Sequence, residues 1–371
     1  MKLLVVVGTR PNFIKVTQFR KRILEKYSGF DLKIVHTGQH YDEKMADVFF
    51  SQFDLHPDYF LNISPNSPVK QMAEIMVSLE DLIDNIYTPD LIIVPGDVNS
   101  TLAAAIVANK KGIKLAHLES GLRSFDLGMP EEWNRLLVDE MADYYFVTEE
   151  SGLTFLEKEG RKGKVFHVGN TMIDTMVAFE CQIQANPILQ DLNVKEREFV
   201  LMTVHRPSNV DHRKGIETLI RLLEYLDQRF KVVFPIHPRT RARIKDFGFE
   251  EAFVGLKNVF TTPPLDYFAF QKLIASCKMV LTDSGGIQEE TTFRQVPCLT
   301  LRENTERPVT VDLGTNTLVP FDFETIQRYV DQVILGTYKT GQVPPFWDGK
   351  ATDRILEKLQ DIANENIILS S

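Results

Sequence analysis

Residues 90–119 read DLIIVPGDVNSTLAAAIVANKKGIKLAHLE, and this stretch decides the fold class. Two short apolar runs, 90–96 and 112–119, flank a helix-length segment that starts near Ser100. Runs that are apolar almost throughout, rather than alternating, are typical of strands buried on both faces of a parallel sheet. The stretch therefore predicts a strand–helix–strand unit with parallel strands.

The same rhythm continues along the whole chain of 371 residues, a length that favours two domains. Helix-length segments such as 13–27 separate the apolar runs. The other candidate strands are 2–8, 31–37, 142–148 and 163–169 in the first half, and 198–204, 229–236, 257–262, 277–283, 296–301 and 316–320 in the second. We expect an α/β protein with two Rossmann-like, doubly wound domains that face a cleft. The expected domains are 1–172 and 173–351, with a C-terminal helix at 352–371 that packs back on the first domain.

Composition and charge exclude several classes of protein. The net charge of −9 argues against a nucleic-acid partner, because affinity for polyanions comes mainly from basic surface. The three cysteines are scattered, which argues against a disulfide framework and a structural zinc site. The N-terminal apolar run is too short for a signal peptide, and no segment has the roughly 20 apolar residues of a membrane span. We therefore expect a cytoplasmic protein with no membrane partner.

Polar residues follow the strands of the first half, where ligands bind in open α/β sheets. Arg10 and Lys15 come after the first strand, and Gln39 and His40 after the second; they are candidate ligand contacts or ordinary solvated and structural side chains. Three carboxylates, Asp97, Glu119 and Glu131, follow the next strands. Like charges held together raise one another's pKa, which suits acid–base catalysis near neutral pH. Each could also be a turn, cap or loop charge.

In the second half, His205 and Arg206 follow one strand, and His237 follows the next. The stretch LTDSGGIQEETTF (281–293) places Ser284, Gly285 and Gly286 at a helix start, where main-chain N–H groups and the helix dipole bind phosphate. A plain turn, with Glu289 and Glu290 stabilising the dipole, fits as well. The stretch is neither a Walker A motif nor GxGxxG.

Nine motifs from residue 8 to 308 together resemble the non-hydrolysing UDP-N-acetylglucosamine 2-epimerase family. They are GTRPNFIK, TGQH, PGDVNST, ESGLR…MPEEWNR, VGNTMID, TVHRPSN, IHPR, DSGGIQEE and RENTERP. The resemblance implies a GT-B fold and interconversion of UDP-N-acetylglucosamine and UDP-N-acetylmannosamine, for surface polysaccharide synthesis. It implies elimination and re-addition of UDP without metal or nicotinamide cofactor, and commonly a homodimer.

The resemblance also assigns roles residue by residue. Asp97, Glu119 and Glu131 are implied as the acid–base group, with His205 assisting at the diphosphate. The implied substrate contacts are Arg10, Lys15, Ser284, Gly285, Gly286, Glu290 for the ribose, and Arg307 for the sugar hydroxyls. Glu289 is left with only a dipole-stabilising role. A regulatory UDP-N-acetylglucosamine site is implied at Gln39, His40, Arg206 and His237.

The chain departs from the family pattern at Asn12, Pro95 and the residues after Arg206. Several alternatives therefore stay open. The substrate could be a related UDP-diacetamido-uronic acid, or water could capture the intermediate as in hydrolysing relatives. A GT-B glycosyltransferase and a non-catalytic nucleotide-sugar sensor are the rivals from other functional classes.

Overall fold

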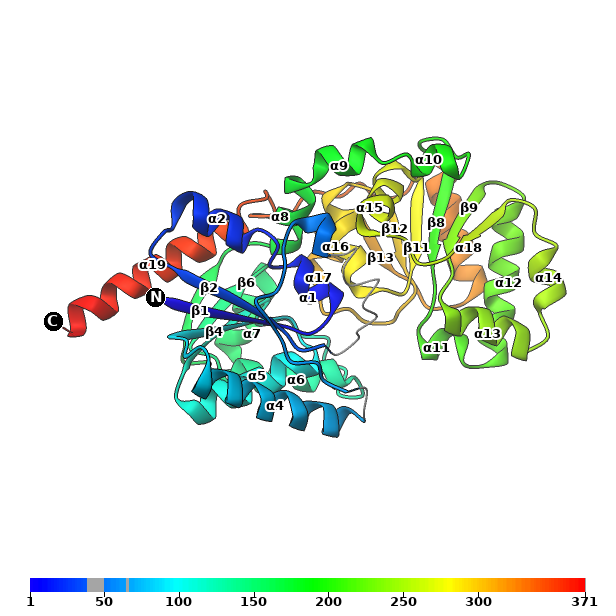
Figure 1. The fold of residues 1–371 in the computed structure, drawn as a ribbon. Coiled ribbons are helices and arrows are strands. Elements are labelled where there is room, and N and C mark those ends of the chain that lie inside the picture. The colour runs from blue at the N-terminus through cyan, green and yellow to red at the C-terminus, as the bar shows by residue number, and fades with distance from the viewer. Residues whose placement is uncertain (39–49, 65–66, 371) are drawn as a thin grey trace. The chain divides into compact units, whose positions relative to one another are not determined.

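The structure is a computed structural model that describes residues 1–38, 50–64 and 67–370. The chain forms two compact units (Figure 1). Unit 1 comprises Met1–Ala178 and Pro345–Ser371, and unit 2 comprises Phe179–Pro344. The chain thus leaves unit 1 six residues after the boundary expected from the sequence and returns seven residues before the expected C-terminal helix.

Unit 1 is built on a seven-stranded parallel sheet in the order β3-β2-β1-β4-β5-β6-β7. Its strands are β1 (Lys2–Val7), β2 (Asp31–His36), β3 (Tyr59–Phe60), β4 (Leu91–Pro95), β5 (Lys114–Leu118), β6 (Tyr144–Val147) and β7 (Lys164–His167). Its helices are α1 (Arg10–Ile14), α2 (Phe19–Lys26), α4 (Pro68–Asn85), α5 (Asn99–Lys111), α6 (Pro130–Met141), α7 (Glu150–Lys158), α8 (Thr171–Ala178) and α19 (Ala351–Ser370). In Figure 1, α4, α5 and α6 cover one face of this sheet, and α2, α8 and α19 lie on the other.

Unit 2 has a six-stranded parallel sheet in the order β10-β9-β8-β11-β12-β13. Its strands are β8 (Phe199–Thr203), β9 (Lys231–Pro235), β10 (Val259–Thr262), β11 (Met279–Thr282), β12 (Cys298–Thr300) and β13 (Asn316–Leu318). Its helices are α9 (Glu180–Ala185), α10 (Ile188–Asp191), α11 (Pro207–Val210), α12 (Arg213–Asp227), α13 (Pro238–Asp246), α14 (Glu250–Val254), α15 (Tyr267–Ser276), α16 (Gly285–Phe293), α17 (Pro308–Asp312) and α18 (Phe323–Leu335).

Both sheets confirm the predicted doubly wound α/β fold. In each unit the chain first adds strands toward one edge of the sheet. It then returns to the middle and adds the remaining strands toward the other edge. The winding direction changes between β1 and β4 in unit 1 and between β8 and β11 in unit 2. Such switch points are where open α/β sheets bind ligands.

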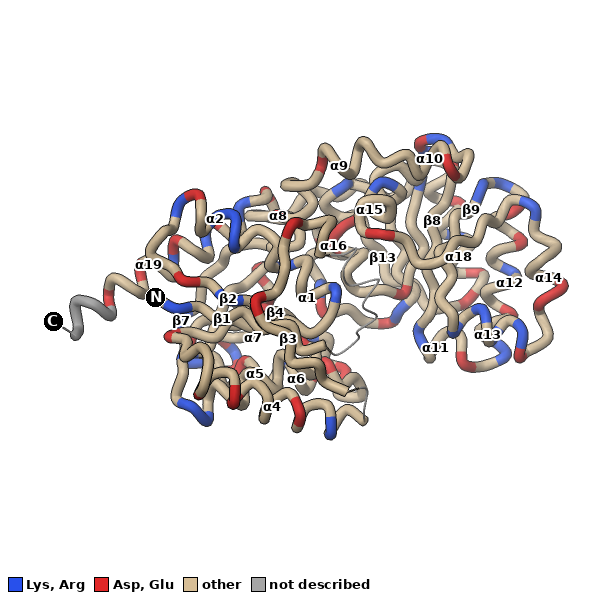
Figure 2. The backbone as a smooth tube through the Cα atoms, viewed as in Figure 1, with Lys and Arg blue, Asp and Glu red and all other residues tan. Residues whose placement is uncertain are grey.

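The cores lie between the sheets and their helices. In unit 2 one cluster packs α12, α13 and α18 against one face of the sheet, and a second packs α10, α15 and α16 against the other. Inner strands such as β1, β4, β8 and β11 are buried on both faces, as their continuous apolar runs predict, whereas the edge strands β3, β7 and β10 are partly exposed. Figure 2 shows acidic and basic residues interspersed along both units.

Two local features differ from the sequence-based expectation. The helix expected over 13–27 is interrupted between α1 and α2, where Thr17 binds Thr175 and Lys15 turns to a partner on another strand end. The two-residue strand β3 was not predicted because it is too short to show a pattern.

No helix in the described residues has the length and apolar character needed to cross a membrane.

Candidate active site

The switch point of unit 1 gathers residues from the ends of β1, β4 and β5. Lys15 Nζ donates to Glu119 Oε2 at 2.6 Å, and both side chains are almost completely buried. Glu119 has a φ of +67°, a left-handed conformation that a non-glycine residue adopts only at a free-energy cost. Its N–H donates to the carbonyl of Phe146 at 3.0 Å, which holds the turn. The strained backbone therefore orients a buried carboxylate toward a lysine.

Gly96 explains how these side chains come so close to the end of β4. Its φ is +66°, and a Cβ there would lie 3.0 Å from Lys15 Nζ and 3.2 Å from Asn12 Nδ2. Asn12 is itself fixed, because its amide donates to the carbonyl of Pro95 at 3.0 Å. Only glycine leaves room for this packing.

Asp97 follows Gly96 and is held by α6. Arg135 Nε donates to Asp97 Oδ2 at 2.9 Å, and Asn134 donates to the main-chain carbonyl of Asp97 at 2.7 Å. Glu131 lies in the first turn of the same helix and is half-buried. The helix that carries Glu131 is therefore bound directly to Asp97.

The neighbouring acid of α6 has a structural role. Glu132 accepts hydrogen bonds from the Ser124 N–H at 3.0 Å and the Phe125 N–H at 2.9 Å, and it pairs with Arg135. It thus fixes the loop after β5 and completes the set of contacts that orient Arg135.

At the switch point of unit 2, Asp283 organises the end of β8. Its Oδ2 accepts from the N–H groups of His205 at 2.8 Å and Arg206 at 2.7 Å, while its Oδ1 lies 2.9 Å from His205 Nδ1. Burial raises the pKa of Asp283, but the hydrogen bonds from His205 and Arg206 outweigh burial and leave the pKa below its ordinary value. Asp283 is thus an anion that sets the orientation of a partly exposed His205.

His237 lies beside His205, with ring centroids 5.4 Å apart. Its Nδ1 accepts from the Arg239 N–H at 3.1 Å and caps α13. Burial, together with the nearby His205 and Arg239, lowers the pKa of His237. The two histidines that follow neighbouring strands in the sequence, His205 and His237, therefore lie side by side.

The helix start at Ser284–Gly286 is also present. Ser284 is the N-cap of α16, and Gly285 is its first residue. A Cβ on Gly285 would lie 2.7 Å from Glu306 Oε1 and 3.4 Å from an Nη1 of Arg307. Glu306 in turn pairs with Arg302 and Arg307. A buried group of two cations and one carboxylate therefore packs against the glycine turn.

The expectation that Glu289 only stabilises the helix dipole is wrong. Glu289 is fully buried, lies beyond the first turn of α16, and pairs with Arg307 Nε at 2.7 Å. A buried carboxylate is retained where a cation compensates its charge, and Arg307 supplies that cation. Glu290, the next residue, is also buried in α16.

Three of the predicted site residues remain: Arg10, Gln39 and His40. Arg10 is exposed and is the first residue of α1. Gln39 and His40 lie outside the described residues, so the four residues of the predicted regulatory site are not all described.

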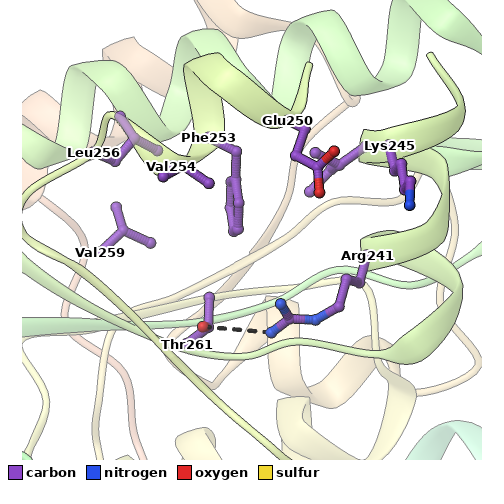
Figure 3. A pocket seen from close by; sticks show the side chains of 9 residues that line it. Arg241, Lys245, Glu250, Phe253, Val254, Leu256, Val259 and Thr261 are labelled. Atoms are coloured by element: carbon purple, nitrogen blue, oxygen red, sulfur yellow. Dashed lines mark hydrogen bonds between the residues drawn. The ribbon is translucent and has the colours of Figure 1, made fainter. Parts of the chain in front are cut away.

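None of the predicted site residues lines one open pocket of unit 2 (Figure 3). It has a volume of about 230 Å³ and lies between α13, α14 and the edge strand β10, lined by Arg241, Ile244, Lys245, Glu250, Phe253, Val254, Leu256, Val259 and Thr261. Within the described part of the chain, no three His, Cys, Asp or Glu side chains lie together as a possible metal site.

Sequence reasoning missed the residues that orient the candidate site: Arg135, Asp139, His117, Asp283 and Glu306. Most act through a partner on another element, such as Asp283 with His205, 78 positions away, whereas Glu306 pairs with Arg302 and Arg307 of its own segment. Arg135, Asp283 and Glu306 are charged residues inside quoted motifs, whereas His117 and Asp139 lie outside all nine motifs and gave no signal.

The fold first defines the class of protein. Sucrose-phosphate synthase from Thermosynechococcus elongatus matches with a TM-score of 0.60 over the whole of both chains at 12% identity, which supports the GT-B fold. The family model for UDP-N-acetylglucosamine 2-epimerase matches residues 22–360. The chain belongs to the UDP-N-acetylglucosamine 2-epimerase family.

Individual relatives agree along the full length. The UDP-N-acetylglucosamine 2-epimerase of Methanocaldococcus jannaschii is 38% identical over 97% of this chain and 99% of the relative. A crystal structure of the enzyme from that organism, in complex with UDP-GlcNAc and UDP, covers 97% of this chain and 99% of that chain at 36% identity, with a TM-score of 0.87. The UDP-2,3-diacetamido-2,3-dideoxy-D-glucuronate 2-epimerase of Pseudomonas aeruginosa is 35% identical over 97% of this chain and 99% of the relative.

Proposed function

We propose that the protein interconverts UDP-N-acetylglucosamine and UDP-N-acetylmannosamine. The observation that carries this proposal is the buried Lys15–Glu119 pair at the unit 1 switch point, next to the strand end that bears Asp97. A carboxylate that is buried, strained and oriented by a cation is costly to keep for stability alone. It is well suited to transfer a proton at a defined place.

The chemistry requires more than one acid–base group. The C2 hydrogen of the sugar has no adjacent carbonyl, so simple deprotonation is too slow. If a base takes the C2 proton while the C1–O bond to UDP breaks, a C1=C2 double bond forms and UDP leaves. Re-addition of UDP at C1, with a proton delivered to the other face of C2, gives the epimer.

We assign this proton transfer to Asp97, Glu119 and Glu131. Asp97 and Glu119 follow neighbouring strands, and Glu131 lies on the helix that binds Asp97 through Arg135. His205, oriented by Asp283, assists at the diphosphate. A charged histidine or its N–H stabilises the negative charge that develops on the leaving UDP.

We assign nucleotide binding mainly to residues of unit 2. The start of α16 at Ser284, Gly285 and Gly286 binds the diphosphate through main-chain N–H groups. Glu290 accepts from the ribose hydroxyls, and Arg307, oriented by Glu289 and Glu306, reaches the sugar hydroxyls. Arg10 and Lys15 of unit 1 add positive charge for the diphosphate.

Incubation of UDP-N-acetylglucosamine with the protein in D2O tests the reaction. We expect deuterium at C2 of the recovered nucleotide sugar, together with UDP-N-acetylmannosamine. Absence of deuterium removes the proposal for this substrate. Accumulation of UDP and free N-acetylmannosamine identifies a hydrolysing enzyme, transfer to an acceptor a glycosyltransferase, and binding without turnover a sensor.

A second substrate is favoured by one specific relative. The Pseudomonas aeruginosa protein, named for a diacetamido-glucuronate nucleotide, is 35% identical to this chain, which lies between the 38% and 34% of two enzymes named for UDP-N-acetylglucosamine. The same exchange experiment with that nucleotide decides between them, because the preferred substrate has the higher kcat/KM.

We also propose an oligomeric state and a form of regulation. The protein forms a homodimer, which light scattering tests by mass. Its rate responds to UDP-N-acetylglucosamine at a regulatory site that includes Arg206 and His237. A sigmoidal dependence of rate on substrate that becomes hyperbolic in the His237→Ala variant supports the second proposal, and a hyperbolic wild type removes it.

A further inference from the structure

A fully buried histidine and a fully buried carboxylate lie next to the residues of the unit 1 switch point. His117 is on β5 and Asp139 is on the last turn of α6, and neither side chain is exposed. His117 Nδ1 lies 2.6 Å from Asp139 Oδ1, and His117 Nε2 lies 2.8 Å from the main-chain carbonyl of Gly96. The pair thus joins β5, α6 and the end of β4.

The chemistry of the two partners fixes the hydrogens on the ring. The Gly96 carbonyl can only accept, so Nε2 must carry a hydrogen and donate it. The short contact between Nδ1 and the carboxylate also contains a hydrogen, since two acceptors would repel at 2.6 Å. The ring of His117 therefore makes two hydrogen bonds, one at each nitrogen.

Asp139 is held in the ionised form by a second set of contacts. Its Oδ2 lies 2.7 Å from Arg123 Nη1 and accepts from the Gly121 N–H at 3.0 Å. Arg123 is fixed in turn by a bidentate pair with Glu159, at 2.8 and 2.7 Å. Burial raises the pKa of Asp139, but His117 and Arg123 outweigh burial and leave it lowered.

These contacts reach each of the three carboxylates assigned to proton transfer. Gly96, which accepts from His117, directly precedes Asp97. Glu119 lies between His117 and Gly121, which are both bound to Asp139. Glu131 lies in the first turn of α6, and Asp139 lies in the last turn of the same helix. One buried pair therefore sets the relative positions of all three.

We propose that His117, together with Asp139, is a positioning residue that sets the register of Asp97, Glu119 and Glu131 by hydrogen-bonding the Gly96 carbonyl. The proposal rests on the proposed epimerase function for its kinetic consequence. His117 does not contact the substrate and transfers no proton in this scheme. Its effect is on the geometry of the acid–base group, so it acts on kcat rather than on nucleotide affinity.

Two substitutions separate the two hydrogen bonds. The amide nitrogen of glutamine reaches the position of Nε2, and that of asparagine reaches the position of Nδ1. His117→Gln therefore keeps the bond to Gly96 and loses the one to Asp139, while His117→Asn does the reverse. His167→Gln, a half-buried histidine on β7 of the same unit, is the matched control.

We measure C2 deuterium exchange, KM and UDP affinity for each variant. His117→Asn is expected to lose kcat by roughly 100-fold, the size of effect that a misplacement of about 1 Å produces, with KM within about threefold. His117→Gln is expected to retain kcat within about tenfold of wild type, and the control to leave it unchanged. Equal losses in the two variants, or a change in KM alone, overturn the proposal.

A second measurement does not depend on activity or on the variants folding. In wild-type protein with ¹⁵N-labelled histidine, we expect one ring with both N–H protons protected from solvent exchange. His36, the other buried histidine among the described residues, accepts at Nδ1 from the Gly38 N–H and cannot give this signal. Absence of a doubly protonated, protected ring overturns the assignment of both hydrogen bonds, whether or not the wild type exchanges deuterium. If that ring is present and the wild type shows no exchange, the epimerase function fails and the kinetic role of His117 fails with it.

Discussion

Lys15 and Glu119, 104 positions apart in the chain, form a 2.6 Å ion pair in which each side chain is at most 6% exposed. Removal of one member of a buried pair typically costs about 3–5 kcal/mol, because the other charge stays buried. Lys15→Met should therefore lower the free energy of unfolding by an amount in this range. Lys111→Met, which breaks the more exposed pair with Asp84, should cost much less.

The double variant Lys15→Met/Glu119→Gln checks the cause. Without the buried carboxylate, loss of the ammonium should matter much less, so the double variant should be more stable than Lys15→Met alone. Additive losses would show that the pair is not coupled. Glu119→Gln by itself should abolish C2 exchange and retain UDP binding, and retained exchange would remove Glu119 from proton transfer.

A second prediction concerns Asp283, which accepts main-chain hydrogen bonds from His205 and Arg206. Both N–H groups bind Oδ2, and His205 Nδ1 lies at Oδ1, so the single oxygen of Asp283→Asn can serve only one of these two places. The contact that meets the N–H₂ group instead should cost about 1–3 kcal/mol of stability. Because the pKa of Asp283 is lowered in the folded state, its contribution is present at neutral pH and lost as pH falls through that pKa.

The difference in Tm between wild type and Asp283→Asn should therefore be largest near pH 7 and shrink in acid. The matched control is Asp211→Asn, whose carboxylate is only partly buried and pairs with Arg239 and Arg243 at the surface. A Tm difference that grows on acidification would contradict the assigned direction. Exchange at C2 should also slow in Asp283→Asn, because His205 loses the carboxylate at Nδ1.

Much of the fold could be predicted because the decisive signal is local. The apolar run at 90–96 and the helix-length segment that starts near Ser100 each show their pattern within a few residues, and they form β4 (Leu91–Pro95) and α5 (Asn99–Lys111). Where a side chain finds its partner far away, the local pattern misleads. The helix expected over 13–27 breaks where Lys15 and Thr17 bind Glu119 and Thr175.

The same limit applies to the site. Residues after strands were recognisable as candidates because the carboxyl ends of parallel strands meet at one edge. Their orienting partners were not, since nothing near Glu289 in sequence indicates Arg307, and nothing near His117 indicates Asp139. A hydrogen bond between two elements depends on their packing, which only the structure contains.

A third prediction tests the glycine turn at α16. In Gly285→Ala the new Cβ would lie 2.7 Å from Glu306 Oε1, so the carboxylate must move and disturb its pairs with Arg302 and Arg307. UDP affinity, measured by isothermal titration, should fall by roughly tenfold, equivalent to about 1.4 kcal/mol. Gly255→Ala is the control, because its Cβ would meet nothing closer than 3.4 Å. Unchanged affinity in Gly285→Ala would show that UDP does not use this turn.

The last prediction concerns Asp174 of α8, which joins the segment that leaves unit 1 to the one that returns. Its carboxylate accepts from the main-chain N–H groups of Ala351 at 3.0 Å and Thr352 at 2.5 Å, at the start of α19. Burial raises the pKa of Asp174 to about 6, against the opposing effect of these hydrogen bonds. The folded state therefore binds the proton more tightly than the unfolded chain does. Stability from this group is present below the ordinary pKa of 3.8 and is lost as pH rises through about 6.

Asp174→Asn removes this pH dependence, because asparagine has nearly the same shape and stays neutral. Its single oxygen can accept from only one of the two N–H groups, because Ala351 and Thr352 bind different oxygens of the carboxylate. Near pH 4 the variant should be less stable than wild type, because one N–H group has lost its acceptor. Between pH 4 and pH 7 it should gain up to about 3 kcal/mol relative to wild type, as expected for a pKa shift of this size. The measurement is the difference in Tm between variant and wild type across that range. Asp361→Asn, on the exposed face of the same helix, should show no such trend. If the Tm of the variant minus that of wild type is constant, or falls as pH rises, the hydrogen bonds to α19 outweigh burial. Asp174 then holds the returning segment as an anion.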